Sequence, residues 1–200
     1  DPKRFYPNPI VRKMVREEMG LNDSTIVFLY VGRLKREKGL FELAKAFSNV
    51  YLQNKNVRLW IIGPDEENIK VELDHILSTI RGAISFIPYT LEPEKYMATA
   101  DVFCLPSHRE GFGSTIIEAA ACGIPAIGSR IYGITDAIVD GETGLLVEKG
   151  NIHELTDAMM KLMNSECLRK HMGNSAKQRV IKYFQQERLT FELLKLINNE

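Results

Sequence analysis

Residues 25–51 read TIVFLYVGRLKREKGLFELAKAFSNVY. The almost continuous apolar run over Thr25–Gly32 predicts a strand covered on both faces, as in a parallel sheet. Apolar side chains then recur at the spacing of one helix face, at Leu40, Leu43, Ala44, Phe47 and Tyr51. A strand that leads within a few residues into a helix predicts a βαβ unit.

The same alternation continues along the chain. Apolar runs predict further strands at Val57–Gly63, Ile84–Ile87, Asp101–Leu105, Gly144–Val147 and from Pro125 to Gly128. Helical patterns cover Glu66–Ile80, Glu92–Thr99, part of Ser114–Ala121 and all of Ile152–Asn198. The predicted fold class is therefore α/β, a Rossmann-like, doubly wound parallel sheet of about six strands.

The length of the chain, 200 residues, suits one domain with a substantial core. We expect residues 25–150 to form the sheet core and residues 151–200 to form C-terminal helices. Residues 1–24 stand outside the alternation, because Pro2, Pro7 and Pro9 favour an extended lead-in before a short helix over Val11–Met19.

Composition excludes several classes of protein. The chain has 26 Lys and Arg against 26 Asp and Glu, and zero net charge argues against general nucleic-acid binding. Apolar runs such as residues 26–31 are too short to span a membrane, and no secretory signal follows Asp1. The three cysteines, at 104, 122 and 167, lack the spacing of a disulfide framework or a zinc site, so we expect a reducing, cytoplasmic location.

Chemistry-bearing residues follow the predicted strands. In open parallel sheets, ligands bind beyond the carboxyl ends of the strands. The first strand is followed by four cations and one acid between Gly32 and Gly39. The other strands are followed by Gly63, by Pro88 and Tyr89, by Pro106–Thr115 and by Ser129–Gly133. Glycines, hydroxyls and charges are therefore expected to gather at one edge of the sheet.

The segment Pro106–Thr115 is typical of a phosphate site. Gly111 and Gly113 allow a ligand to approach the backbone closely, and N–H groups near Ser114 and Thr115 open the next helix. Arg33 and Lys38 are available to neutralise the same anion, which predicts a doubly charged phosphate group as ligand. The alternative is an ordinary helix cap at Ser114 beside a solvated basic loop.

Two acids flank this site. Carboxylates accept hydrogen bonds from sugar hydroxyls, often two at once. Glu110 before the helix and Glu118 one turn inside it are therefore candidates for holding a sugar on either side of a diphosphate. The alternative makes Glu110 an exposed loop acid and Glu118 a helix surface acid.

Taken together, these residues resemble the nucleotide-binding C-terminal domain of retaining GT-B glycosyltransferases, the group called glycosyltransferase family 4. The resemblance runs from about Ile26 to Asn151, and Glu110 and Glu118 stand eight apart, as in the E-x7-E signature of the family. The other matching pieces are Gly32-Arg33-Leu34, Lys38-Gly39, Gly63, Pro106-Ser107, Glu110-Gly111-Phe112-Gly113, Glu118-Ala119, Gly123-Ile124-Pro125 and Asp140–Val147.

The resemblance implies a role for each matched residue. Arg33 and Lys38 would bind the diphosphate and stabilise the leaving group, and Glu110 would bind donor-sugar hydroxyls, which makes these three the candidate catalytic residues. Glu118 would accept hydrogen bonds from the ribose hydroxyls. The remaining donor-binding candidates are Gly32, Gly63, Ile87, Pro88, Tyr89, Ser107, Arg109, Gly111, Phe112, Gly113, Ser114 and Thr115. The chain has no Asp-x-Asp motif, so we expect neither a metal nor a cofactor, with a nucleoside-diphosphate sugar as substrate.

The resemblance also implies what lies outside this chain. The opening residues resemble the segment after the hinge of the family, so an N-terminal acceptor domain is expected to precede them. A glycan or a lipid-linked acceptor, polysaccharide biosynthesis, and a place at the inner face of the membrane are further expectations for the full-length protein. Two alternatives stay open: a non-enzymatic Rossmann module that binds a nucleotide, and a GT-B relative such as a sugar-nucleotide 2-epimerase.

Overall fold

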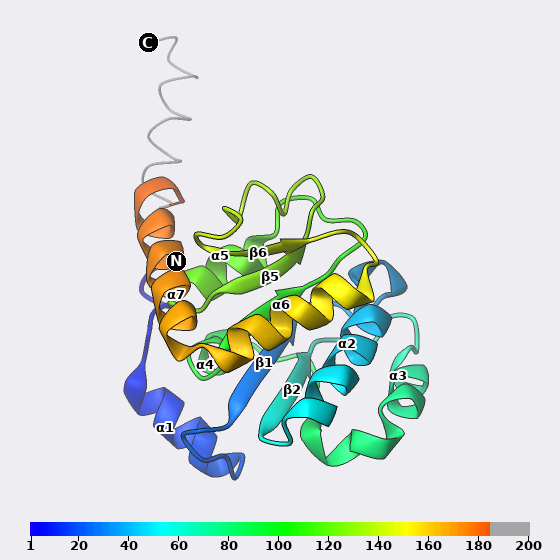
Figure 1. The fold of residues 1–200 in the computed structure, drawn as a ribbon. Helices are drawn as coiled ribbons and strands as arrows, with labels where there is room; N and C mark the ends of the chain where they lie inside the picture. Colours follow the sequence, from blue (N-terminus) through cyan, green and yellow to red (C-terminus); the bar gives the residue numbers. More distant parts are fainter. Residues whose placement is uncertain (185–200) are drawn as a thin grey trace.

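A computed structural model describes residues 1–184 of the chain. It contains one parallel sheet of six strands in the order β3-β2-β1-β4-β5-β6 (Figure 1). The strands are β1 (Ile26–Val31), β2 (Val57–Ile62), β3 (Ile84–Ile87), β4 (Val102–Leu105), β5 (Ala126–Ser129) and β6 (Gly144–Val147). This order is that of a doubly wound Rossmann sheet, so the predicted fold class is confirmed.

Helices cover both faces of the sheet. On one face α6 lies beside α2, which also contacts α3, and on the other face α4 and α5 are neighbours (Figure 1). The helices are α1 (Pro9–Glu18), α2 (Leu40–Gln53), α3 (Lys70–Ile76), α4 (Pro93–Met97), α5 (Ser114–Ala121), α6 (Ile152–Asn164) and α7 (Glu166–Tyr183), with 3-10 turns η1 (Arg36–Lys38) and η2 (Ser78–Ala83). Covered on both faces, Val27–Tyr30 of β1 is fully buried.

The long helix predicted over Glu66–Ile80 is wrong. The carboxylate of Asp65 accepts hydrogen bonds from the backbone N–H groups of Ile69 (2.9 Å) and Lys70 (3.1 Å), which delays the start of α3 to Lys70. After Ile76 the chain tightens into η2, where Ile80 leaves helical geometry with φ −127°. Apolar periodicity does not reveal such a contact, because the contact is made by a polar side chain that precedes the pattern.

The helical pattern over Ile152–Asn198 is two helices in the part that the structure describes. Ser165 adopts an extended backbone (φ −131°, ψ 97°) between α6 and α7, and its side chain accepts from the N–H of Leu168 at 3.2 Å. Residues 185–198 of this prediction lie outside the described residues. At the other end of the chain, α1 begins at Pro9 instead of Val11, because Asn8 caps it.

None of the helices within residues 1–184 has the length and apolar character needed to cross a membrane.

The strand order creates one crevice. Strand β1 pairs with β2 on one side and with β4 on the other, so the chain leaves β1 and β4 in opposite directions across the sheet. Ligands of open α/β sheets bind at this reversal, beyond the carboxyl ends of the strands. The two loops that meet there are 32–39 and 106–113, which carry most of the predicted site residues.

Candidate functional site

The loops after β1 and β4 are in direct contact. The backbone N–H of His108 donates to the carbonyl of Glu37 at 2.7 Å. Gly39 adopts a left-handed conformation (φ 69°) so close to Pro106 that a Cβ atom there would lie 1.9 Å from the Pro106 carbonyl oxygen. Only glycine tolerates both the conformation and the approach. The crevice is therefore assembled by backbone contacts.

Lys38 and Glu110 form an ion pair across this crevice. The Nζ atom of Lys38 lies 2.9 Å from Oε2 of Glu110 and also donates to the carbonyl of Arg109 at 3.4 Å. The Lys38 side chain is 11% exposed and that of Glu110 is 20% exposed. Glu110 is therefore not the exposed loop acid of the alternative hypothesis. Two of the three candidate catalytic residues are in direct contact.

Arg33 lies at the other side of the same loop. Its side chain is 53% exposed and 3.5 Å from Glu66, which is also paired with Lys35 at 2.8 Å. The backbone beneath it is fixed, because the hydroxyl of Tyr30 donates to the Arg33 carbonyl at 2.8 Å. Burial of that hydroxyl raises the pKa of Tyr30 above its ordinary value. A fixed backbone and a half-exposed guanidinium with one weak ion pair suit a residue that reaches for a ligand.

The amino end of α5 faces the crevice without a side-chain cap. Gly113 is the N-cap, in a left-handed conformation (φ 63°), and no side chain of the described residues bonds the first turn. Ser114 is the first helical residue, so the alternative in which Ser114 caps the helix is wrong. Uncapped N–H groups at a helix start attract anions. The backbone of Gly133 packs against the loop before α5, next to the carbonyl groups of Glu110 and Gly111.

A cavity of about 470 Å³ opens at the carboxyl ends of β1 and β2. Its wall contains six of the predicted donor-site residues, namely Gly32, Arg33, Gly63, Tyr89, Thr115 and Glu118. They come from three separate loops and from α5, so the fold has gathered residues that are up to 86 positions apart (32 to 118). Thr115 and Glu118 of α5 line this cavity, and Glu110 of the ion pair stands four residues before Ser114, the first residue of α5.

Glu118 is the half-buried acid of this cavity. Burial raises the pKa of its carboxyl group, and the positive charge of Arg4 opposes that rise. Within the described part of the chain, no hydrogen bond reaches the carboxylate. A half-buried acid without a hydrogen-bond partner is not the solvated surface acid of the alternative hypothesis, and such a group is suited to accept ligand hydroxyls.

The chain matches the sequence pattern of one family over residues 11–179, the family described as Glycosyl transferases group 1. The chain belongs to this family. The capsular polysaccharide biosynthesis glycosyltransferase CapM of Staphylococcus aureus is 36% identical over 179 residues, which cover 89% of this chain and 47% of CapM. The chain thus spans about half the length of the curated relatives that it matches.

Solved structures of glycosyltransferases share the fold. The Anabaena protein HepE, crystallised with UDP and glucose, superposes with a TM-score of 0.92 at 19% identity, over 100% of this chain and 55% of HepE. The C-terminal domain of the group 1 glycosyltransferase LpcC from Francisella tularensis superposes with a TM-score of 0.85 at 22% identity, over 93% of this chain and 98% of that domain. These matches identify the fold as the Rossmann-like half of a GT-B architecture.

Several predicted residues of this glycosyltransferase domain lie outside the 470 Å³ cavity. Ile87 and Pro88 line a neighbouring hollow of about 260 Å³, and Tyr89 lines both. Phe112 packs edge-on against Phe184 at the end of α7, with 6.1 Å between the ring centres. Six further predicted residues also lie outside the cavity, in the segments after β1 and β4 and at the start of α5, namely Lys38, Arg109, Glu110, Gly111, Gly113 and Ser114.

Ser107 does not line the open pocket as expected. Its side chain is fully buried, and its hydroxyl has no hydrogen-bond partner among residues 1–184. The next residue, His108, turns toward α2, where its Nε2 atom lies 3.1 Å from Glu42. The apolar strand β4 ends at Leu105, only two residues before Ser107. The side chain of Ser107 therefore still lies inside the core.

Arg4, Thr90 and Leu91 also line the 470 Å³ cavity, and no sequence pattern had assigned them to a site. Arg4 belongs to the lead-in segment, which looks like a connector because of its prolines. Thr90 and Leu91, in the loop after β3, carry no charge. The chain brings them to the cavity only through tertiary contacts, so local spacing contains no signal for them.

Proposed function

We propose that this chain is the donor-binding half of a retaining glycosyltransferase, which moves a sugar from a nucleoside diphosphate to an acceptor hydroxyl. One observation carries the proposal: the Lys38–Glu110 pair, the uncapped start of α5 and the Glu118 cavity meet at the reversal point of the sheet. This arrangement offers cations and N–H groups for a diphosphate between two acids for sugar hydroxyls.

The diphosphate would occupy the crevice at the start of α5. Negative charge builds on the leaving diphosphate as the bond to the sugar breaks, and groups already aimed at that charge lower the barrier. Arg33, Lys38 and the N–H groups near Ser114 are such groups. Because these groups can supply the positive charge, we propose that the reaction needs no metal ion.

The Lys38–Glu110 ion pair would open when the donor binds. The diphosphate competes with Glu110 for the ammonium group of Lys38, and the released carboxylate then accepts sugar hydroxyls. On the other side of α5, Glu118 would accept from the ribose, with the base against Ile87–Tyr89. The hollow at Ile87–Tyr89 supports this placement, since it shares Tyr89 with the Glu118 cavity.

Retention of the anomeric configuration is proposed from the resemblance to family 4. The acceptor, a glycan or a lipid-linked sugar, would be bound by a further domain, since the chain spans 47% of CapM. The name of that relative supports a role in polysaccharide biosynthesis. We place the full-length enzyme in the cytoplasm, where nucleotide sugars would be its substrates.

The two acids are expected to have separable roles. Glu118→Ala should weaken a nucleoside diphosphate and its sugar conjugate by similar factors, because both carry the ribose. Glu110→Ala should weaken only the sugar conjugate. The expected loss is about 1.5–3 kcal/mol per charged hydrogen bond, or one to two decades in affinity. The measurement is calorimetric titration of both variants with both ligands in EDTA, after a thermal-shift screen of UDP, GDP and ADP.

Two results of that titration would contradict the assignment. Equal loss of the bare diphosphate in both variants would show that Glu110 does not face a sugar, and would favour the alternative of a non-enzymatic nucleotide module. Binding that requires Mg²⁺ would contradict the absence of a metal. A thermal shift with the nucleotide sugar shows that the sugar conjugate binds. If NMR of the recovered nucleotide sugar then shows that its sugar has been epimerised, the 2-epimerase alternative is favoured.

By itself the chain is expected to bind the donor and transfer nothing. Transfer needs a closed cleft that excludes water and orients the acceptor hydroxyl. The chain resembles one of the two lobes that would form such a cleft. The check is a transfer assay with the nucleotide sugar that binds and with simple glycoside acceptors, in which glycoside product would contradict the proposal.

A further inference from the structure

Arg4 connects the lead-in segment to the nucleoside side of the cavity. Its Nε atom donates to Oε2 of Glu94 in α4 at 2.9 Å, and its guanidinium also donates to the carbonyl of Leu91. Arg4, Thr90 and Leu91 all line the 470 Å³ cavity, next to Tyr89 and Glu118. One side chain thus joins three parts of the cavity wall: the lead-in, the loop after β3 and the start of α4.

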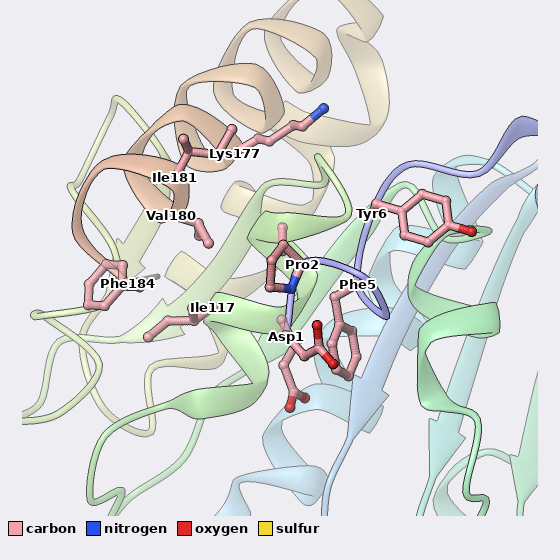
Figure 2. A pocket seen from close by; sticks show the side chains of 11 residues that line it. Asp1, Pro2, Phe5, Tyr6, Ile117, Lys177, Val180, Ile181 and Phe184 are labelled. Atoms are coloured by element: carbon pink, nitrogen blue, oxygen red, sulfur yellow. The ribbon is translucent and has the colours of Figure 1, made fainter. Parts of the chain in front are cut away.

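The backbone that carries Arg4 is firmly anchored. The backbone N–H groups of Arg4 and Phe5 donate to the Asp1 carbonyl at 3.1 and 3.0 Å, and Phe5 is 6% exposed. Figure 2 shows Pro2 and Phe5 gathered with Ile117 of α5 and Val180 of α7 around a smaller hollow of about 150 Å³. The Arg4 guanidinium lies 5.2 Å from the centre of the Phe5 ring.

Arg4 is also the cation that acts most strongly on Glu118. The charged side chains that face Glu118 are Arg4 and Glu94 of α4. Arg33 and Glu66 share the larger cavity with it, and Lys177 of α7 shares the smaller one. Arg4 lowers the pKa of Glu118, whereas burial and Glu94 raise it.

We propose that Arg4 is a positioning residue of the donor site, which holds the Thr90–Leu91 wall and the Glu118 carboxylate ready for the nucleoside. The inference rests on the proposed function of this cavity. Arg4 acts through other groups: through Glu94 and the Leu91 carbonyl it fixes the wall, and through its charge it favours the ionised carboxylate of Glu118. An ionised carboxylate accepts hydrogen bonds from both ribose hydroxyls, and a protonated one loses part of that capacity.

The test compares variants that break the same ion pair from its two ends. Arg4→Gln removes the cation and should raise the pKa of Glu118, whereas Glu94→Gln removes a like charge and should lower it. Lys3→Gln is the matched control, since Lys3 is the neighbouring cation and does not line the 470 Å³ cavity. Each variant is titrated by calorimetry from pH 5 to 8 with the nucleoside diphosphate that gives the largest thermal shift, and with inorganic diphosphate.

Three results are expected. Near pH 7, Arg4→Gln binds the nucleoside diphosphate about ten-fold more weakly, the effect of one charge-assisted contact, and binds inorganic diphosphate as the wild type does. The loss of affinity on acidification begins at higher pH in Arg4→Gln and at lower pH in Glu94→Gln. Lys3→Gln matches the wild type. Titration of the phosphate itself is common to all variants, so only the differences between them count.

The proposal is overturned if Arg4→Gln and Glu94→Gln weaken binding by the same factor and neither changes the pH at which affinity is lost on acidification (the acid limb). The Arg4–Glu94 ion pair would then have only a structural role. It is also overturned if Arg4→Gln loses inorganic diphosphate. Should Arg4→Gln fail to fold, Arg4→Lys replaces it, and retention of the charge should keep the acid limb at the wild-type position. If the wild-type chain binds no nucleoside diphosphate, the proposed function fails, whatever Arg4 does.

Discussion

Replacing Lys38 by methionine is expected to lower the affinity for a nucleoside diphosphate by about two decades. Charge-assisted hydrogen bonds contribute about 1.5–3 kcal/mol, and this ammonium group is poorly exposed, so water screens it weakly. The substitution also leaves Glu110 without its ion-pair partner, beside the place proposed for the diphosphate. Lost attraction and new repulsion therefore act in the same direction.

Lys35 provides a matched control for this experiment. It stands in the same basic loop, and its Nζ atom lies 2.8 Å from Glu66, much as that of Lys38 lies 2.9 Å from Glu110. Lys35→Met should change affinity by less than about three-fold, since Lys35 pairs with Glu66 instead of Glu110 and does not line the 470 Å³ cavity. Calorimetry of both variants decides the matter, and equal losses would mean that the general charge of the loop binds the ligand.

A double variant separates the two effects of Lys38. Lys38→Met leaves the half-buried carboxylate of Glu110 without its partner, so it should also lower the thermal stability of the chain. Adding Glu110→Gln removes that unpaired charge and should restore the thermal stability. Affinity for the diphosphate should recover only in part, because the cation is still missing. Full recovery would show that Lys38 serves to neutralise Glu110 and does not bind the ligand.

Replacing Arg16 by methionine is expected to lower the free energy of unfolding by about 3–5 kcal/mol, the range for breaking a buried ion pair. Arg16 is 3% exposed, and burial lowers the pKa of its guanidinium. It donates to the carbonyls of Asn22, Thr25 and Thr99 and lies 3.5 Å from Asp101. Methionine fills much of the volume and satisfies none of these acceptors.

Arg16 joins β1 to β4 at the edge opposite the donor site. Its partner Asp101 also accepts from the N–H of Val27 at 2.8 Å and pairs with Arg12 at 2.7 Å. Urea unfolding measures the loss, with Lys13→Met on the exposed side of α1 as the control, expected within about 0.5 kcal/mol of the wild type. A loss below 1 kcal/mol for Arg16→Met would contradict the buried role, and nucleotide affinity of the folded protein should not change.

The sequence by itself determined the architecture. Burial on both faces requires unbroken apolar strands, and a helix against a sheet requires a 3.6-residue period, so Ile26–Val31 and Leu40–Gln53 could be placed from their own letters. The crevice could be placed as well, because the carboxyl ends of parallel strands meet at one edge. The patterns 32–39 and 110–118 indicated a glycosyltransferase, and the match of residues 11–179 to Glycosyl transferases group 1 confirmed this coarser assignment.

Only the tertiary structure decided which of these residues touch. The Lys38–Glu110 pair joins residues 72 positions apart, and the Arg4–Glu94 pair joins residues 90 apart. Such contacts depend on the order of the strands and on how deeply each loop is buried. Both are properties of the whole packed chain, so no periodic pattern in the local sequence predicts them. Hydrogen bonds accepted by the side chains of Asp65 and Ser165 interrupt two long helical patterns for a related reason. Apolar spacing records where the core lies, whereas a single hydrogen-bonding side chain decides where a helix begins.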